Sequence, residues 1–598
     1  MSVTLKKLFY ILPKGDAVKL FVLFVLMLIA AALEVAGIGM IPAFVAIVAD
    51  PDRVMSAEWL QPIIAMLGIG NAQDLLIWGS VVLVGIFIIK SIYIITFNYF
   101  EARFIYNRRY TISYRLMQSY MQAPYTFHLQ RNTSELLRNI SQEINVLINN
   151  VITNILMMGR EGVITLAILI FLFSMEPLIT MLVILLSGFG AGTFILLNKK
   201  KMKEYGEEEQ ERRAEMIKAV NQGLGGIKEA RVLNREDEFI DKFRVEAFKS
   251  TRLMAYLRFI QQIPRPVVET TAVLGMLMIA VLLVWQDRSM GVIIPILTLF
   301  AMATVRLMPS VQQLVSMYTR LRYNIVSLDP VYDDLKELAA FNTQFKKDRK
   351  KNNQLKLNDC IKINTVSYHY PDSEVQALEN ISLTVPKGKA VGFVGSSGAG
   401  KTTIVDLILG LLEPDKGEIL IDGIDIQQNL SAWQKNLGYI PQSIYLADET
   451  LRSNIAFGIP KEEIDDSKVL NAVKLAQLGT LIEQLPDGLE TIIGENGTRL
   501  SGGQRQRVGI ARALYHAPDV LVMDEATSAL DNITEKQITS AIESLKGERT
   551  LIMIAHRLST VKNCDMLYFM EEGKIVEQGT YDDLVHSNIR FREMALEA

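Results

Sequence analysis

Six long apolar stretches occupy the first part of this 598-residue chain. They are residues 20–49, 75–100, 146–175, 177–198, 266–285 and 289–319, and each holds at most two charged side chains. A helix needs about 20 apolar residues to cross the hydrocarbon core of a bilayer, whereas runs of about 10–14 suffice for a buried helix of a soluble protein. The stretches therefore predict an all-α domain of six membrane-spanning helices.

Lysine and arginine mark the side of the membrane on which the connections lie. They gather before the first stretch, between the second and third, and between the fourth and fifth, whereas the other connections are nearly free of them. Cytoplasmic loops carry this excess, so we expect the N-terminus and the C-terminal half to be cytoplasmic. The two long charged connections, such as 199–258, have helical periodicity and predict helices that continue beyond the bilayer, with solvated loops as the alternative.

The composition changes at about residue 340. The whole chain is 50% hydrophobic with a mean hydropathy of +0.22, but its later part resembles a soluble α/β domain. We predict a transmembrane domain over residues 1–325, a linker over 326–359 and a soluble domain over 360–598. The net charge of −3 and the two cysteines argue against a nucleic-acid partner and a disulfide framework. The N-terminus lacks an early cleavage pattern for a signal peptide.

A glycine-rich segment opens the chemistry of the soluble domain. It consists of Gly395, Ser396, Ser397, Gly398, Ala399, Gly400, Lys401, Thr402 and Thr403. An apolar run precedes it and apolar residues at helical spacing follow it, which is the strand–loop–helix context of a phosphate-binding P-loop. We expect Lys401 to contact the β- and γ-phosphates of ATP and the Thr402 hydroxyl to ligate Mg²⁺. A flexible Gly/Ser turn, the alternative, would not need these flanking elements.

A second apolar run, residues 520–525, ends in two carboxylates. Asp524 can hold Mg²⁺ through water, and the adjacent Glu525 can polarise the water that attacks the γ-phosphate. Such strand ends are common, so this motif gains its meaning from the P-loop.

One further motif has the pattern of a single family. Leu500, Ser501, Gly502, Gly503 and Gln504 match the signature motif of ATP-binding cassette (ABC) ATPases. From the linker to the C-terminus the chain resembles that family. The resemblance implies that this motif opens a helix facing the γ-phosphate held by a second cassette.

Other positions match the family residue by residue. Gln442 resembles the Q-loop glutamine, which contacts Mg²⁺ and the membrane domain. Asp531 lies in the D-loop pattern 528–531, and His556 resembles the switch histidine near the γ-phosphate. Tyr370 resembles the aromatic residue that stacks on adenine. Asn496 departs from the exporter pattern, which usually has arginine there, and this puts one contact between cassettes in doubt.

Six spans before one cassette resemble half of an ABC exporter. Because Glu525 and His556 are both present, two copies would form two competent ATP sites, and we predict a homodimer in the bacterial inner membrane with its cassettes in the cytoplasm. The apolar half resembles bacterial lipid-linked oligosaccharide flippases of the PglK type. The resemblance rests on residues 33–39 with Pro42, the segment around Trp59, residues 132–137 and residues 306–310.

Cations within or near the spans point in the same direction. Lys90, Arg265 and Arg306, if unpaired, would attract an anion such as a lipid diphosphate. Alternatively, Glu34, Glu161 and Glu269 pair with them as structural salt bridges. Another lipid, a peptide or a drug is the alternative cargo, and an ATP-gated channel or regulator is the alternative of a different class.

Overall fold

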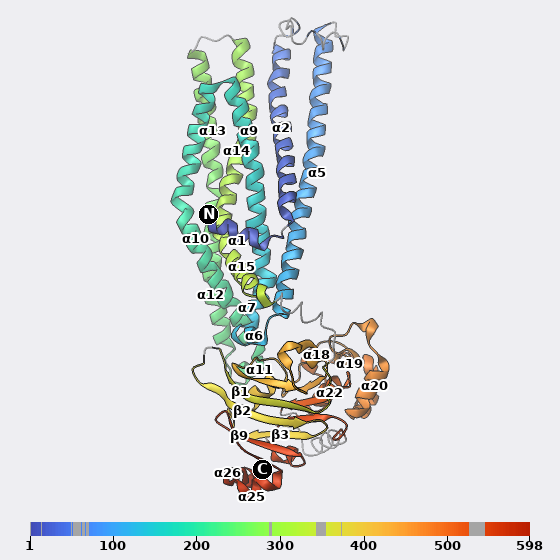
Figure 1. Cartoon of the computed structure of the whole chain (residues 1–598). Helices are drawn as coiled ribbons and strands as arrows, with labels where there is room; N and C mark the ends of the chain where they lie inside the picture. Colours follow the sequence, from blue (N-terminus) through green and yellow to red (C-terminus); the bar gives the residue numbers. More distant parts are fainter. Residues whose placement is uncertain are drawn as a thin grey trace. The chain divides into compact units, whose positions relative to one another are not determined.

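The fold is taken from a computed structural model of the chain, shown in Figure 1. It describes residues 2–13, 15–49, 51, 55, 61, 66, 71–285, 290–341, 355–371, 373–524, 545–555 and 557–597. Two compact units result, one of residues 1–122 and 131–340 and the other of residues 123–130 and 341–598. Residues 342–354 of the predicted linker 326–359 and most of the outer segment around Trp59 lie outside the described residues, whereas residues 326–340 belong to the first unit.

The first unit consists of long helices lying side by side. Its main elements are α1 (Ser2–Ile11), α2 (Asp16–Ala49), α5 (Ala72–Met121), α7 (Thr133–Arg138), α9 (Thr153–Met175), α10 (Pro177–Gly225), α11 (Ile227–Val232), α12 (Glu236–Gln262), α13 (Pro264–Trp285), α14 (Met290–Asn324) and α15 (Leu328–Glu337). Five helices among the described residues are long and apolar enough to cross a membrane, and the predicted fourth span, 177–198, is the first part of α10. Apolar side chains of α2, α9, α13 and α14 form the core of this unit.

Helices continue through the charged connections, as the periodicity predicts. α5 runs from the apolar segment through residues 101–121, and α10 and α12 cover most of 199–258. α10 and α12 lie against each other, where the Arg212 guanidinium is 3.2 Å from the Glu246 carboxylate and the rings of Tyr205 and Tyr256 meet edge to face. Solvated loops, the alternative, do not occur over these described residues.

The second unit contains two sheets. The antiparallel sheet has the order β2 (Gln376–Pro386), β1 (Cys360–His369), β4 (Lys416–Ile421) and β5 (Ile424–Asp425). The larger sheet has the order β10 (Lys574–Gly579), β9 (Met566–Glu571), β3 (Ala390–Gly395), β8 (Thr550–Ile554), β7 (Val520–Asp524) and β6 (Leu437–Ile440). All neighbouring pairs of this sheet are parallel except β9 and β10.

Two apolar cores cover the two faces of the larger sheet. On β7, Val520 and Val522 belong to one core, and Leu521 and Met523 belong to the other. This alternation follows from the pleat of a strand, whose side chains point to opposite faces in turn. Strands buried on both faces read as continuous apolar runs, which is why β3 and β7 are visible in the sequence. The predicted fold, a helical transmembrane domain plus an α/β domain, is the fold found.

Gly206 on α10 marks a close approach to α14. A Cβ atom at this position would lie only 2.0 Å from the Tyr323 carbonyl oxygen. We predict that Gly206→Ala lowers stability by about 1–3 kcal/mol, because the two helix backbones would have to separate. The measurement is the thermal unfolding midpoint of the full chain in detergent.

The control is Gly192→Ala in the same helix, where an added Cβ meets no atom within 4 Å. Equal midpoints for the two variants would contradict the predicted role of Gly206 in helix packing.

Candidate functional site

The parallel strands of the larger sheet bring the sequence-predicted residues to one edge. The P-loop follows β3, Gln442 follows β6, and Asp524 is the last residue of β7. Since β3, β8, β7 and β6 are parallel, their carboxyl ends share an edge, where ligands of open α/β sheets bind. Glu525, Ser528, Asp531 and His556 lie outside the described residues.

The P-loop depends on glycine at three positions. Gly395 has φ +155°, and a Cβ there would lie 2.1 Å from the Met570 carbonyl oxygen. Gly400, with φ +95°, is the N-cap of α17 (Lys401–Ile408), and its Cβ would lie 2.7 Å from Leu378 Cδ2. At Gly398, by contrast, an added Cβ meets no atom within 4 Å, so its φ of +82° is the constraint. The backbone is therefore held in a loop that larger side chains would distort.

Lys401 is positioned by the loop itself. Its ammonium donates to the carbonyl oxygens of Gly395 at 2.9 Å and Ser396 at 2.8 Å, and the residue is buried. A buried cation beside the N-terminus of α17 creates a positive site in which an anionic phosphate is favourable. The residues present therefore fit a nucleotide phosphate.

Tyr370 lies at the same end of α17. Its hydroxyl is 3.1 Å from the Thr403 hydroxyl, and its ring meets Tyr368 edge to face. The ring is half-buried, which leaves part of it accessible. Adenine stacking by Tyr370 stays a prediction.

The acidic side of the site contains a carboxyl group that the sequence analysis missed. Burial, together with the negative charge of Asp524, raises the pKa of Asp406 to about 6. The two carboxyl groups are therefore close enough to repel each other, which a cation between them would relieve. The oxygens of Asp524 and Thr402 are donors that Mg²⁺ prefers. A carboxyl group one helical turn after Lys401 was the available signal.

Residues 123–130 belong to the cassette's compact unit although the chain places them between α5 and α7. They include α6 (Tyr125–Gln130). Burial, with further contributions from nearby Asp406 and Tyr370, raises the pKa of the Tyr125 hydroxyl. The sequence analysis did not single out this segment, and its short length leaves no periodicity to detect.

The signature motif begins α22 (Gly502–Leu514). The Ser501 hydroxyl accepts a hydrogen bond from Gln504 N at 3.3 Å, and the Gln504 side-chain oxygen accepts one from Ser501 N at 2.8 Å. This reciprocal capping box fixes the helix start, and the spacing of Ser501 and Gln504 could have predicted it. Leu500 is buried in the core, while Gly502 and Gly503 form the first turn, whose N–H groups give the helix a positive end.

Asn496 has a local explanation. Its φ is +53°, in the left-handed region, and its N–H bonds to the Leu446 carbonyl at 3.1 Å. Asparagine tolerates this conformation better than most residues. The departure from arginine therefore fits the backbone here.

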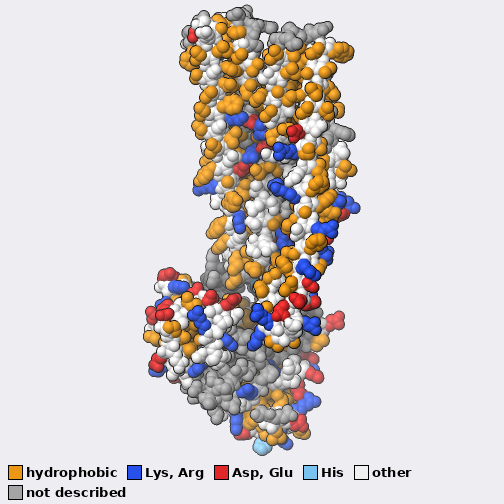
Figure 2. All heavy atoms as spheres, turned by 180° about the vertical axis from the view of Figure 1, so that it is seen from behind, with side chains coloured by type: hydrophobic (Ala, Val, Ile, Leu, Met, Phe, Trp, Pro, Cys, Tyr) orange, Lys and Arg blue, Asp and Glu red, His pale blue; other side chains and the backbone are white. Residues whose placement is uncertain are grey.

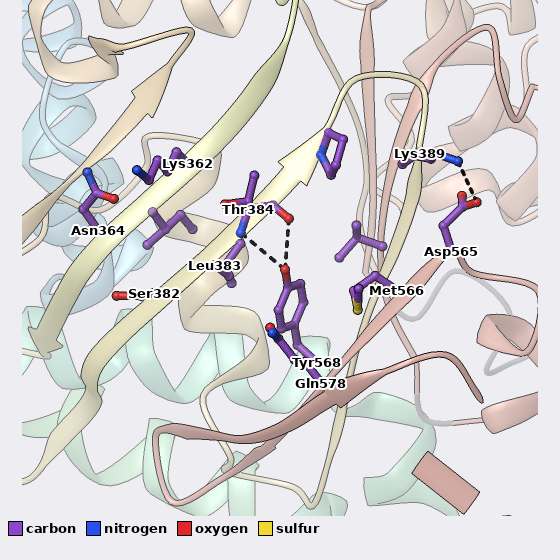
Figure 3. A pocket seen from close by; sticks show the side chains of 13 residues that line it. Lys362, Asn364, Ser382, Leu383, Thr384, Lys389, Asp565, Met566, Tyr568 and Gln578 are labelled. Carbon is purple, nitrogen blue, oxygen red and sulfur yellow. Dashed lines mark hydrogen bonds and ion pairs between the residues drawn. The ribbon is translucent and has the colours of Figure 1, made fainter. Parts of the chain in front are cut away.

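A groove of about 620 Å³ lies apart from these residues, between β1 and β2 on one side and β9 on the other (Figure 3). The Tyr568 hydroxyl in its floor donates to the Thr384 carbonyl at 2.9 Å. At its rim, Asp565 faces the Lys389 ammonium at 3.3 Å. Of the described residues that line this groove, none belongs to the nucleotide-binding set predicted from the sequence.

Two of the predicted cations of the membrane domain, Lys90 and Arg306, are paired. The Lys90 ammonium lies 2.5 Å from the Glu34 carboxylate, and Arg306 also contacts Glu34. The Arg306 guanidinium is 3.4 Å from Glu161, and both contact the Ser310 hydroxyl at 2.7 Å. The expectation of unpaired cations is wrong for Lys90 and Arg306, because each finds a buried carboxylate on a neighbouring helix.

The other predicted residues lie apart from this cluster. Arg265 and Glu269 are exposed on α13, and over the described residues no ion pair joins either of them to Lys90 or Arg306. Arg160 pairs with Glu101 at 2.9 Å and with Glu161 at 3.4 Å. The alternative hypothesis, in which glutamates pair with these cations as salt bridges, therefore applies to Glu34 and Glu161 but, among the described contacts, not to Glu269.

Comparisons with known proteins agree with this architecture. The model of the ABC transporter transmembrane region matches residues 36–307, and the model of the ABC transporter matches residues 378–528. An ATP-dependent lipid A-core flippase of Haemophilus influenzae is 30% identical over 526 residues, covering 86% of each chain. One of Escherichia coli K12 is 28% identical over 558 residues, covering 92% of this chain and 93% of that protein.

A solved structure of a bacterial Atm1-family ABC exporter with ATP bound has the same fold. The TM-score is 0.75 at 22% sequence identity, and the match covers 98% of each chain.

Asp565 is expected to make cassette stability depend on pH. Burial by itself raises the pKa of its carboxyl. The Ala390 N–H at 2.9 Å and the ammonium groups of Lys546 and Lys389 together lower this pKa by more than burial raises it, so the pKa lies below its usual value. A lowered folded-state pKa contributes stability above the unfolded pKa of about 3.9, which is lost as pH falls through the folded-state value. We predict that Asp565→Asn destabilises the protein by about 1–2 kcal/mol near neutral pH.

The measurement is the unfolding midpoint of the full chain near neutral pH and in steps below about pH 3.9, where the difference between wild type and variant should shrink progressively as pH falls. Glu548→Gln, an exposed carboxylate nearby in the sequence, is the control. A difference that stays constant with pH would contradict the ionised role of Asp565.

Proposed function

This chain belongs to the ABC transporter family, and from that membership we propose that two copies of it form an ATP-driven exporter of a lipid with an anionic head group. The chain is an ATPase coupled to transport across a membrane. The observation that carries the proposal is the shared carboxyl edge, which holds the P-loop, Gln442 and Asp524, in a chain that also has a helical membrane domain.

The nucleotide is expected to bind through residues of this chain in defined roles. The P-loop N–H groups and Lys401 hold the phosphates, and Tyr370 supports the adenine. Thr402, Gln442 and Asp524 would hold Mg²⁺, which neutralises phosphate charge when it is bound. Glu525 orients the attacking water and His556 stabilises the transferred phosphate, both assigned from the sequence motif.

A homodimer follows from the signature motif. The N-terminal end of α22 carries a partial positive charge, which favours an anion. In the family pattern that anion is the γ-phosphate held by the partner cassette. Each copy contributes one P-loop and one signature motif, so each ATP requires both copies. Binding of ATP then favours the closed pair, and hydrolysis releases it, which shifts the population of membrane-domain states. Glu525→Gln should therefore trap the closed pair.

An anionic lipid is supported as cargo by two observations. The curated relatives are named lipid A-core flippases, and the membrane domain holds a cluster of cations that are partly accessible. A lipid-linked oligosaccharide with a diphosphate is the specific candidate, and another lipid remains the alternative. The proposed location is the bacterial inner membrane, with the cassettes in the cytoplasm.

Lys401→Ala is predicted to abolish ATP hydrolysis, with a loss of at least about a hundredfold, because it removes the cation that faces the phosphates. The measurement is phosphate release by the full chain in nanodiscs. Lys387→Ala, at an exposed position just before β3, is the control. Hydrolysis at the wild-type rate by the Lys401 variant would refute the nucleotide assignment.

Arg306→Ala and Lys90→Ala are predicted to reduce lipid flipping and lipid-stimulated ATPase by about tenfold or more, because a desolvated charge pair to the head group is lost. The assay uses proteoliposomes containing a polyprenyl diphosphate. Lys200→Ala, an exposed lysine on α10, is the control. Unchanged flipping and stimulation would reject an anionic lipid. Stimulation by peptides instead would favour that cargo, and ATP turnover without any lipid movement would favour gating.

A further inference from the structure

The buried ion pairs connect two pairs of helices. Glu34 and Lys90 join α2 to α5, whereas Arg306, Glu161 and Ser310 join α14 to α9. Among the described residues, two ion pairs link these helix pairs, Arg306 with Glu34 and Arg160 with Glu101, and apolar side chains of α2 also pack against α9 and α14. Figure 2 shows charged side chains gathered within the otherwise apolar helices.

The charged residues lie among the apolar core residues of their helices. Glu34 lies between Ala31 and Ile38 of the membrane-domain core, and Arg306 lies between Ala303 and Leu307. Charges at such positions are costly in a membrane and must be neutralised in every state of the transport cycle. Arg306 and Lys90 therefore need a negative charge nearby both with and without bound cargo.

The two signs of charge differ in accessibility. The side chains of Lys90 and Arg306 are 17% and 25% exposed, whereas those of Glu34 and Glu161 are 7% and 5% exposed. A molecule that reaches the cluster therefore meets the cations first. An approaching anion is attracted to the accessible groups, while the carboxylates stay behind them.

The two carboxylates are held differently. Glu161 accepts from the buried Ser310 hydroxyl at 2.7 Å and also contacts Arg306 and Arg160, on its own helix pair. Glu34 contacts Lys90 at 2.5 Å within its own helix pair and Arg306 across the boundary between the helix pairs. If the helix pairs separate, α9 and α14 keep two guanidinium groups and one carboxylate, an excess of positive charge. Glu34 is therefore the carboxylate whose place an anion can take.

We propose that Glu34 is an internal counter-anion that the anionic head group of the cargo replaces on Arg306, while Lys90 stays paired with Glu34. This inference rests on the proposed function and makes Glu34 a specificity-determining residue of the same site. An uncharged lipid cannot take over the ion pair with Arg306, so Glu34 selects against it by competition. An anionic lipid neutralises Arg306 when Glu34 withdraws from it, and Glu34 neutralises Arg306 again after release.

The test is Glu34→Gln in the full chain, reconstituted in phosphatidylcholine vesicles that contain either a polyprenyl diphosphate or the matching uncharged polyprenol. The concentration of polyprenyl diphosphate that gives half-maximal ATPase stimulation should fall by about tenfold, because the internal competitor is removed. The concentration of polyprenol that gives half-maximal ATPase stimulation should not fall. A loss of stability with no gain in apparent affinity is what a purely structural salt bridge would give.

Glu101→Gln is the matched control, because it removes an equally buried carboxylate from the other contact between the helix pairs and leaves Lys90 and Arg306 paired. Its half-maximal concentration should stay within about twofold of wild type. Glu34→Asp keeps the charge on a shorter side chain and should give an intermediate value, which supplies the test if the glutamine variant does not fold.

The two proposals fail in different ways. If wild type responds equally to polyprenyl diphosphate and polyprenol, the proposed anionic cargo is wrong. If wild type responds only to the diphosphate but the folded Glu34 variants need the same or a higher concentration of it, the counter-anion role is wrong and the cargo assignment stands.

Discussion

The exclusion of water from the hydrocarbon core is the constraint on which the membrane half of this chain depends. Backbone groups must bond within helices, so the apolar segments become long helices. Charged side chains are costly there unless they are paired, and Glu34 contacts both Lys90 and Arg306. These charged side chains therefore gather into one cluster. Such a cluster can bind a charged molecule.

The cassette follows from a different constraint, the close approach of backbone to backbone. Gly395 lies against the Met570 carbonyl, so the P-loop can exist only where β3 and β9 are neighbours. The parallel sheet then places Gln442 and Asp524 at the same edge. Binding of phosphate thus depends on the register of several strands, and not on the loop sequence alone.

For the segment 123–130, the position in the sequence and the position in the fold differ. It comes from the connection after α5, yet it belongs to the compact unit of the cassette and lies near Asp406 of α17. A residue that closely follows a membrane helix in the sequence therefore lies beside a residue of the helix that the P-loop opens.

The sequence by itself determined the division into membrane and soluble halves, the helical extensions and the P-loop. These features depend on local patterns: the length of an apolar run, the 3.6-residue period and glycine spacing. The sequence could not decide whether Lys90 and Arg306 are paired, because Glu34 and Glu161 are far from Arg306 along the chain. Only helix packing brings them within contact. It likewise could not reveal that Asp406 lies near Asp524 or that segment 123–130 belongs with the cassette, since proximity between distant segments is a property of the tertiary structure.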